Sequence, residues 1–249
     1  MKNIFIILII FVLFFPQEVL SNSDNNKKSS PLRIGTMDLR PYGWKDKKGV
    51  KHGIIFEMNE EIGKRLGVPY INRILPFKRM LKLLKEGSLD IISAQAHEGA
   101  LAAGEKLEVQ FDINVIAGTR KGSKVKNVKD FKGNYFVFHR SASYEELEGI
   151  PRKITYVNGY EQVMRFLNRD IYVDGGVFSE PAYYYWMKEL KLTPKNFGKV
   201  VMITEDKKQW IFVRRNLNTD LKNKIKGIVS KIYEEDLYNN LLMKYGKSN

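Results

Sequence analysis

The spacing of hydrophobic residues alternates along the chain between two patterns. Short apolar runs of strand length, such as Leu32 to Thr36, are separated by segments in which apolar residues recur every three or four positions, as Ile55, Met58 and Ile62 do. The first pattern indicates a buried strand, and the second indicates an amphipathic helix. In the first third of the chain these patterns predict strands at 32–36, 70–75 and 89–93, one helix between Gly53 and Gly67, and another helix at 77–86.

The alternation starts again after a stretch rich in Lys and Gly at 120–129. Ser143 and Glu146 have the spacing of a capping box that would open a short helix. The predicted strands are 134–139, 153–157, 172–178, 198–203 and 209–214, and the predicted helices are 158–168, 180–190, one from about 221 to 232, and 236–245. Two successive α/β units are therefore predicted, each with a mostly parallel sheet covered by helices.

The order of these elements predicts where a site would lie. Open α/β sheets bind ligands in the crevice beyond the carboxyl ends of their strands. We therefore expect functional side chains in the loops after strands 32–36, 89–93, 134–139 and 172–178. Periodicity predicts the place of the site and not its ligand.

The amino-terminal residues have the layout of a secretory signal peptide. A basic start is followed by twelve apolar residues, Ile4 to Phe15, and then by Pro16. A membrane anchor is the alternative, but twelve residues are fewer than the roughly 20 that span a bilayer. We predict a signal peptide at 1–21 and, because 22–30 is polar, a flexible tether at 22–30. The protein is thus expected to be periplasmic or secreted.

Composition narrows the classes of chemistry. The chain has no Cys, which excludes disulfides, thiolate metal sites and Cys nucleophiles. Lys and Arg number 42 against 28 Asp and Glu, a net charge of +14. Such an excess favours an anionic partner or a membrane surface, but the lysines are scattered among acidic residues, as on an ordinary solvated surface. No nucleic-acid motif accompanies them, so no nucleic-acid partner is expected.

Three segments in this order resemble the amino-acid type (family 3) of bacterial extracellular solute-binding proteins. They are LRIGTMDLRPYGWKDKKGVKHGIIFEMNEEIGKRLGV, LPFKRMLKLLKEGSLDIISA and VKDFKGNYFVFHRSASYEEL. The likeness extends from Pro31 to about Tyr245. It implies a type II periplasmic-binding-protein fold of two α/β lobes joined by a two-strand hinge, with a ligand cleft between the lobes. It places lobe 1 at 31–117 plus 205–249 and lobe 2 at 118–204.

The resemblance also implies which residues of lobe 1 face a ligand. Tyr42 stands at the Pro-aromatic position of the family, and Phe77 stands where a ring commonly covers the ligand. Both could instead be core aromatics. Ala94, Gln95 and His97 follow the strand at 89–93, where the family offers polar groups to the ligand.

In lobe 2 the corresponding positions are His139, Ser141, Ser143, Ser179 and Glu180. Ser143 could serve only as a helix cap. Ser179 occupies the position at which the family usually has an Asp for the ligand's amino group, with Glu180 beside it.

Departures from the family pattern bear on the ligand. The family usually has Ser/Thr-x-x-x-Arg after the third strand, and the loop here, AQAHEGALAAGEKLE, contains no Arg. Both charge partners of a free α-amino acid are weakened or missing. Arg40, Arg79 and Arg140 lie near predicted cleft loops and suggest an anionic solute, unless they are solvated surface residues.

An enzymatic function has less support in the sequence than solute binding. Periplasmic dehydratases share the fold but keep the Arg that is missing here, and no hydrolase or phosphate-loop motif is present. A metal site from His97, Glu98 and His139 would require both lobes, and no metal or cofactor is expected. We predict a non-enzymatic monomer that captures a small polar solute, with an ABC-type permease as partner. A sensing role at a membrane receptor is the alternative.

Overall fold

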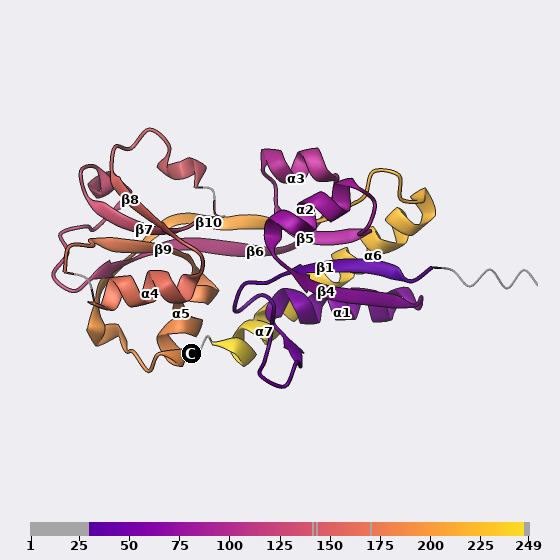
Figure 1. The fold of residues 1–249 in the computed structure, drawn as a ribbon, viewed down its shortest axis with the longest axis horizontal. Helices are drawn as coiled ribbons and strands as arrows, with labels where there is room; N and C mark the ends of the chain where they lie inside the picture. The colour runs from indigo at the N-terminus through magenta and orange to yellow at the C-terminus, as the bar shows by residue number, and fades with distance from the viewer. Residues whose placement is uncertain (1–29, 141, 143, 170, 247–249) are drawn as a thin grey trace, which may run out of the picture.

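Two long antiparallel strands run along the molecule and carry one lobe at each end (Figure 1). They are β6 (Glu105–Arg120) and β10 (Phe197–Val213), which pair with each other over most of their length. The computed structural model describes residues 30–140, 142, 144–169 and 171–246. The predicted signal peptide and all but the last residue of the predicted tether lie outside the described residues.

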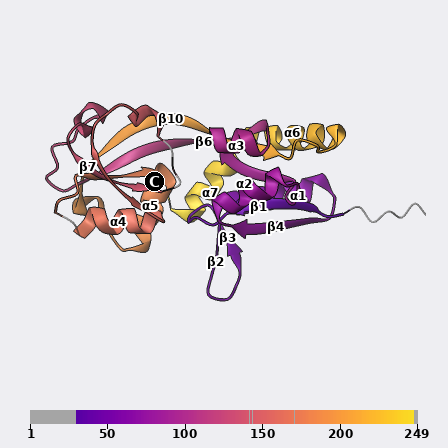
Figure 2. The same ribbon diagram turned by 45° about the horizontal axis from the view of Figure 1, so that its top comes forward.

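The first lobe is built around a parallel group of strands. Strand β1 (Leu32–Met37) lies between β4 (Tyr70–Leu75) and β5 (Ile91–Gln95), and β5 pairs antiparallel with β10. A short hairpin, β2 (Trp44–Lys45) with β3 (Lys51–His52), projects from this lobe (Figure 2). The helices of the lobe are α1 (Ile54–Leu66), α2 (Phe77–Lys85), α3 (Glu98–Ala103), α6 (Thr219–Glu234) and α7 (Leu237–Tyr245).

The second lobe repeats this arrangement with different residues. Strand β7 (Tyr135–His139) lies parallel between β8 (Lys153–Val157) and β9 (Gly175–Ser179), and β9 pairs antiparallel with β6. Its helices are α4 (Tyr160–Arg169) and α5 (Glu180–Glu189), with 3-10 turns at Val128–Phe131, Glu145–Leu147 and Pro194–Asn196. The whole sheet has eight strands in the order β4-β1-β5-β10-β6-β9-β7-β8.

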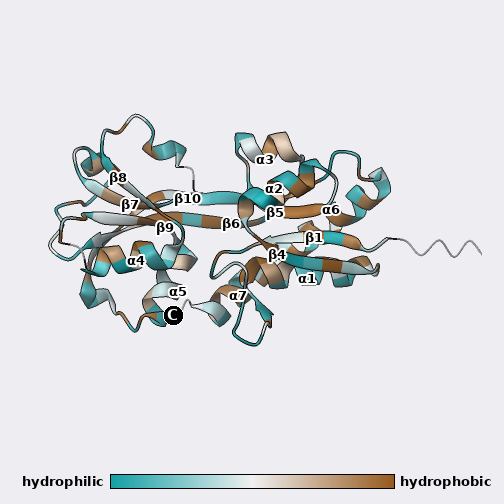
Figure 3. Ribbon diagram, in the orientation of Figure 1, coloured by the Kyte–Doolittle hydropathy of each residue, from teal (hydrophilic) through white to brown (hydrophobic). Residues whose placement is uncertain are grey.

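The hydrophobic pattern explains why these elements pack as they do. In α1 the residues Ile55, Met58 and Ile62 are buried, and Gly67 ends the helix with a φ of 66°, a conformation that glycine adopts without steric cost. Strand β5 begins with two apolar residues, Ile91 and Ile92 (Figure 3), and it is buried from Ile91 to Ala94, as is typical of a strand covered by helices on both faces. The expected α/β class with two lobes is confirmed.

The pairing of β6 with β10 shifts register at five places, two of which lie between Met202 and Lys207, in the part of β10 between the lobes. Irregularities of this kind bend a strand and increase its twist. The two long strands connect the lobes through this irregular part.

Four predicted elements differ from the observed ones. The predicted strands 198–203 and 209–214 are one strand, β10, whose middle is polar because it passes between the lobes and is exposed there. The predicted strand 172–178 begins only at Gly175, since the preceding residues form a turn. The helix expected after a Ser143 cap is a 3-10 turn that follows Tyr144, and Ser143 lies outside the described residues. Strand β6 was not predicted from periodicity.

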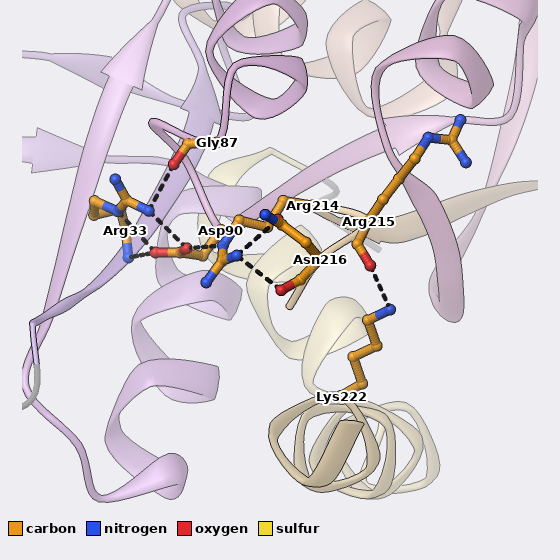
Figure 4. Close-up of polar contacts among 7 residues, drawn as sticks. All are labelled: Arg33, Gly87, Asp90, Arg214, Arg215, Asn216 and Lys222. Carbon is orange, nitrogen blue, oxygen red and sulfur yellow. Dashed lines mark hydrogen bonds and ion pairs between the residues drawn. The ribbon is translucent and has the colours of Figure 1, made fainter. Parts of the chain in front are cut away.

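A buried ion cluster holds together the edge of the first lobe that lies away from the carboxyl ends of its strands (Figure 4). The Asp90 carboxylate accepts hydrogen bonds from the Arg33 backbone N–H at 2.8 Å, from the Arg33 guanidinium at 2.8 and 2.9 Å, and from Arg214 Nε at 2.6 Å. Burial raises the pKa of Asp90, but these hydrogen bonds outweigh it and hold the pKa below its usual value. Asp90 therefore joins β1, β5 and β10 as a structural residue.

Across residues 30–246, apart from positions 141, 143 and 170, no helix combines the length and the apolar character needed to cross a bilayer.

Candidate functional site

A cleft of about 350 Å³ lies between the lobes, at the carboxyl ends of β1, β5, β7 and β9. This is the edge of the sheet at which α/β proteins bind ligands. Residues from the first lobe, from the second lobe and from the hinge strands share its lining. They are Met37, Asp38, Leu39, Tyr42, Ile55, Pro76, Phe77, Gln95, Ala96 and His97, then His139, Arg140, Ala142, Glu145, Asn158, Tyr160 and Ser179, and finally Ile113, Lys207 and Gln209.

More than half of the predicted ligand-facing residues meet in this cleft. From the first lobe come Tyr42, Phe77, Gln95 and His97, and from the second lobe come His139, Arg140 and Ser179. They lie at the carboxyl ends of β5, β7 and β9, at the start of α2 or in the adjoining loops, as the rule on carboxyl ends of strands requires.

The structure places four other predicted residues outside the lining. Arg79 follows Phe77 by two positions, about 200° around α2, and it is exposed. Ala94 is buried on the opposite side of β5 from Gln95, since side chains alternate along a strand. Glu180 begins α5 behind the hinge, where it accepts a hydrogen bond from Asn114 at 2.8 Å.

Arg40 is the fourth, and it lies in a neighbouring pocket with its guanidinium 5.4 Å from the ring centre of Trp44. Ser141 and Ser143 lie outside the described residues. Of the three arginines that suggested an anionic solute, Arg140 alone lines the cleft.

A buried hydrogen bond joins the two lobes at the base of the cleft. The Tyr42 hydroxyl donates to Ser179 Oγ at 2.6 Å, and both residues are at most 5% exposed. Burial raises the pKa of Tyr42 well above its usual value, and burial also raises the pKa of Tyr160 beside it. Both phenols are therefore neutral hydrogen-bonding groups. Ser179, where the family resemblance leads one to expect a carboxylate, is engaged by Tyr42 instead.

The two histidines of the cleft present different ring nitrogens. The His97 Nδ1 accepts from the Gly99 backbone N–H at 3.1 Å, which places the proton of a neutral ring on Nε2. The His139 Nε2 lies 3.1 Å from the Asn158 carbonyl oxygen, which only accepts, so its proton is on Nε2 and its Nδ1 is an acceptor. Burial lowers the pKa of both rings, which favours the neutral forms near pH 7.

Charges of both signs surround these neutral groups. Asp38 and Glu145 contribute carboxylates, and Arg140 and Lys207 contribute cations, of which Lys207 also lies 3.4 Å from Glu146. Sequence reasoning missed Asp38 although it follows a predicted strand. Lys207 and Gln209 could not be found from it, because they lie in the interior of β10, where no loop or motif marks them.

Gln209 is a lining residue with an unused hydrogen-bond donor. It is 4% exposed, and its Nε2 has no hydrogen-bond partner among the described residues. A buried donor without a partner costs about 1–3 kcal/mol, so a bound acceptor would recover that energy.

The side chains of the cleft can hold a solute by non-covalent contacts. The cleft offers a ring (Phe77, with its centre 5.7 Å from that of His97), hydrogen-bond donors and acceptors, and charges of both signs. Among the described residues no group of three or more His, Cys, Asp or Glu side chains is arranged to hold a metal ion.

Comparisons with known proteins agree in fold. No protein-family model and no curated protein matches the sequence. An ancestral arginine-binding protein bound to arginine is 19% identical with a TM-score of 0.70, over 86% of this chain and 97% of the other. A substrate-binding protein of an ABC uptake transporter from Streptococcus pneumoniae, with bound histidine, is 16% identical with a TM-score of 0.70, over 86% and 92%.

A third solved structure comes from another functional class. It is a histidine kinase sensor domain with similarity to periplasmic binding proteins, 18% identical with a TM-score of 0.71, over 87% of this chain and 96% of the other. The three have in common the two-lobed fold that the sequence resemblance implied, and that fold is confirmed for this chain.

Proposed function

We propose that this protein is an exported solute-binding protein that captures a small polar solute between its lobes and delivers it to an ABC-type permease. The observation that carries the proposal is the convergence of side chains from both lobes on one cleft. Phe77 and His97 approach from one side, and His139 and Arg140 from the other. Binding proteins of amino-acid transporters among the structures of the same fold support it.

Lobe closure is the mechanism that this arrangement supports. A ligand in the cleft contacts both lobes only when they are together, so its binding energy favours the closed arrangement. The irregular part of the β6–β10 pairing, between Met202 and Lys207, is the connection about which the lobes would move. We propose that lobe 1 comprises 31–117 plus 205–249 and that lobe 2 comprises 118–204. The boundary at 117/118 lies within β6, and the boundary at 204/205 lies within β10.

The lining favours a solute with both donors and acceptors. Asp38 and Glu145 balance Arg140 and Lys207 in formal charge, and both histidines are neutral near pH 7. With Arg40 and Arg79 outside the lining, a purely anionic solute has less support than a zwitterionic or neutral polar one. Non-covalent capture, and not catalysis, is what this set of groups supports.

Export rests on the sequence. The basic start, the apolar run Ile4 to Phe15 and Pro16 support cleavage of a signal peptide near Ser21 and release to the periplasm or the medium. The released protein would act as a monomer.

Ligand sensing is the second candidate. The histidine kinase sensor domain with the same fold supports it, because the same closure can signal to a membrane receptor in place of delivering a solute. Binding of purified protein to detergent-solubilised permease or receptor from the same membrane separates the two roles.

A binding screen tests the proposal. Amino acids, dicarboxylates, sugars and small peptides are screened by thermal shift, and the solute with the largest shift is titrated by calorimetry. Phe77→Ala should weaken its binding about tenfold, because an aromatic cover contributes roughly 1–2 kcal/mol. Phe166→Ala, on the solvent side of α4, is the matched control and should bind as the unmodified protein does. Equal affinity in Phe77→Ala would contradict the proposed site.

A further inference from the structure

A second cavity lies behind the hinge, on the other face of β6 and β10 from the cleft. Its volume is about 570 Å³. The side chains of Asn114 and Asp206 line it, whereas their neighbours Ile113 and Lys207 line the cleft, as alternation along a strand requires. Helix α5 of the second lobe and helix α7 of the first lie side by side there (Figures 1 and 2) and complete the walls.

The lining of this rear pocket is acidic, in contrast to the chain as a whole. Five carboxylates line it, and none of its lining residues in the described part of the chain is basic. The chain carries a net charge of +14. The five are Asp112, Glu180, Asp206, Glu234 and Asp236. Asp112 forms an ion pair with Lys208 at 3.0 Å, while Asp206, Glu234 and Asp236 form no ion pair among the described residues.

Two further observations point to a positively charged ligand with N–H groups. Gln110 lines the pocket at 1% exposure, and its Oε1 has no hydrogen-bond partner among the described residues. Helix α6 also ends here, with Glu234 as its last residue and Lys231 in the same turn. The carbonyl end of a helix is negative, so it adds to the attraction of Glu234 for a cation in the pocket.

Aromatic rings make up much of the remaining wall. Phe111 and Tyr238 stack with ring centres 4.2 Å apart, and Tyr184 lines the side contributed by α5. Such rings pack against a hydrocarbon chain and attract ammonium groups. The acidic groups here do not form a metal-binding cluster, because no three such side chains in the described residues are arranged to hold a metal ion.

We propose that the rear pocket binds a small organic polyamine, with its ammonium groups held by carboxylates of both lobes and of the hinge and its hydrocarbon chain lying against the rings. The site is separate from the cleft and does not depend on the solute that the cleft binds. General attraction would not produce such binding, since a protein of net charge +14 repels a polyamine overall.

Calorimetric titration of the full chain with spermidine at constant ionic strength tests the proposal. We expect saturable binding at one site, and at least tenfold weaker binding in the double variant Glu234→Gln/Asp236→Asn. Asn fits the Asp236 position, because it tolerates the left-handed backbone there (φ 56°) and also caps a helix. Asp206→Asn, at another left-handed position, is a second variant that also weakens binding.

The control removes the same charge elsewhere. Glu86→Gln/Glu148→Gln, on exposed residues outside the pocket, should bind spermidine as the unmodified chain does. Absence of saturable binding, or an equal loss in this control, would overturn the proposal. So would displacement of spermidine by Mg²⁺ at equal charge concentration, because charge alone would then explain the binding.

Discussion

The Asp90 cluster and the cleft lie at opposite edges of the same strands, and they use similar residues for different purposes. In the cluster each Asp90 oxygen accepts hydrogen bonds from arginines at 2.6 to 2.9 Å (Figure 4). In the cleft a buried Gln209 donor has no partner among the described residues, and charges line an open space. Satisfied buried groups stabilise the fold, whereas unsatisfied ones that line a cavity are positioned for a ligand.

The largest effect on the free energy of unfolding is expected from Asp90→Ala, in the ion cluster and not in the cleft. Removing the carboxylate leaves Arg33 and Arg214 without their buried partner, which costs about 3 kcal/mol of unfolding free energy, at the low end for a buried pair because both arginines reach solvent. Urea unfolding measures the loss. Glu105→Ala, which breaks the more exposed pair with Lys222, should cost less than about 1 kcal/mol.

Asp90→Ala should lower stability without changing the affinity of the cleft for its solute. The folded fraction of Asp90→Ala should bind the solute selected in the screen as tightly as the unmodified protein. A loss of affinity as large as that in Phe77→Ala would show that the two regions are not separate in function.

The second largest effect is expected from acid, which should remove the stabilisation that the Asp90 cluster gives to the fold. The pKa of Asp90 is lowered in the folded state, so the folded protein binds this proton more weakly than the unfolded chain, whose Asp titrates near 3.9. The stabilisation is therefore complete above about pH 4 and is lost as the pH falls through the folded value. Asp90→Asn should show a shallower loss of unfolding free energy between pH 5 and 2, and an unchanged slope would contradict this role.

A smaller effect is expected from His139 in the cleft. Burial lowers its pKa, so its stabilising contribution is present above the unfolded value near 6.5 and is lost as the pH falls through the lowered folded value. His139→Gln should reduce the decline of unfolding free energy below about pH 6.5. The same decline in variant and unmodified protein would show that the ring stays neutral or gains a new partner.

Much of the fold could be predicted from the sequence, because its elements are local. Strand 70–75 and helix α1 with its Gly67 end follow directly from apolar spacing and one turn residue. The two hinge strands differ in this respect. The middle of β10 is polar because it is exposed between the lobes, so the sequence pattern divided it into two strands. Strand β6 alternates apolar and polar residues from Leu107 to Val115, a strand signal that was missed.

The site could be predicted in part, because the sequence indicates where strands end but not which way each side chain points. Phe77 lies in the cleft because it begins a helix directly after a predicted strand, and His97 and Arg140 lie there because they occupy loops that follow predicted strands. Arg40 and Arg79 are close to the same loops in sequence, but side-chain direction turns them away. Direction, and the inward-facing residues of the hinge, depend on tertiary packing that a sequence pattern does not contain.

Small-angle X-ray scattering measures whether the lobes close around a solute, as we propose. The radius of gyration is measured without solute and at saturation with the solute selected in the screen. We expect a smaller radius at saturation, and a smaller change in Phe77→Ala at the same solute concentration. An unchanged radius at demonstrated saturation would contradict closure of the lobes.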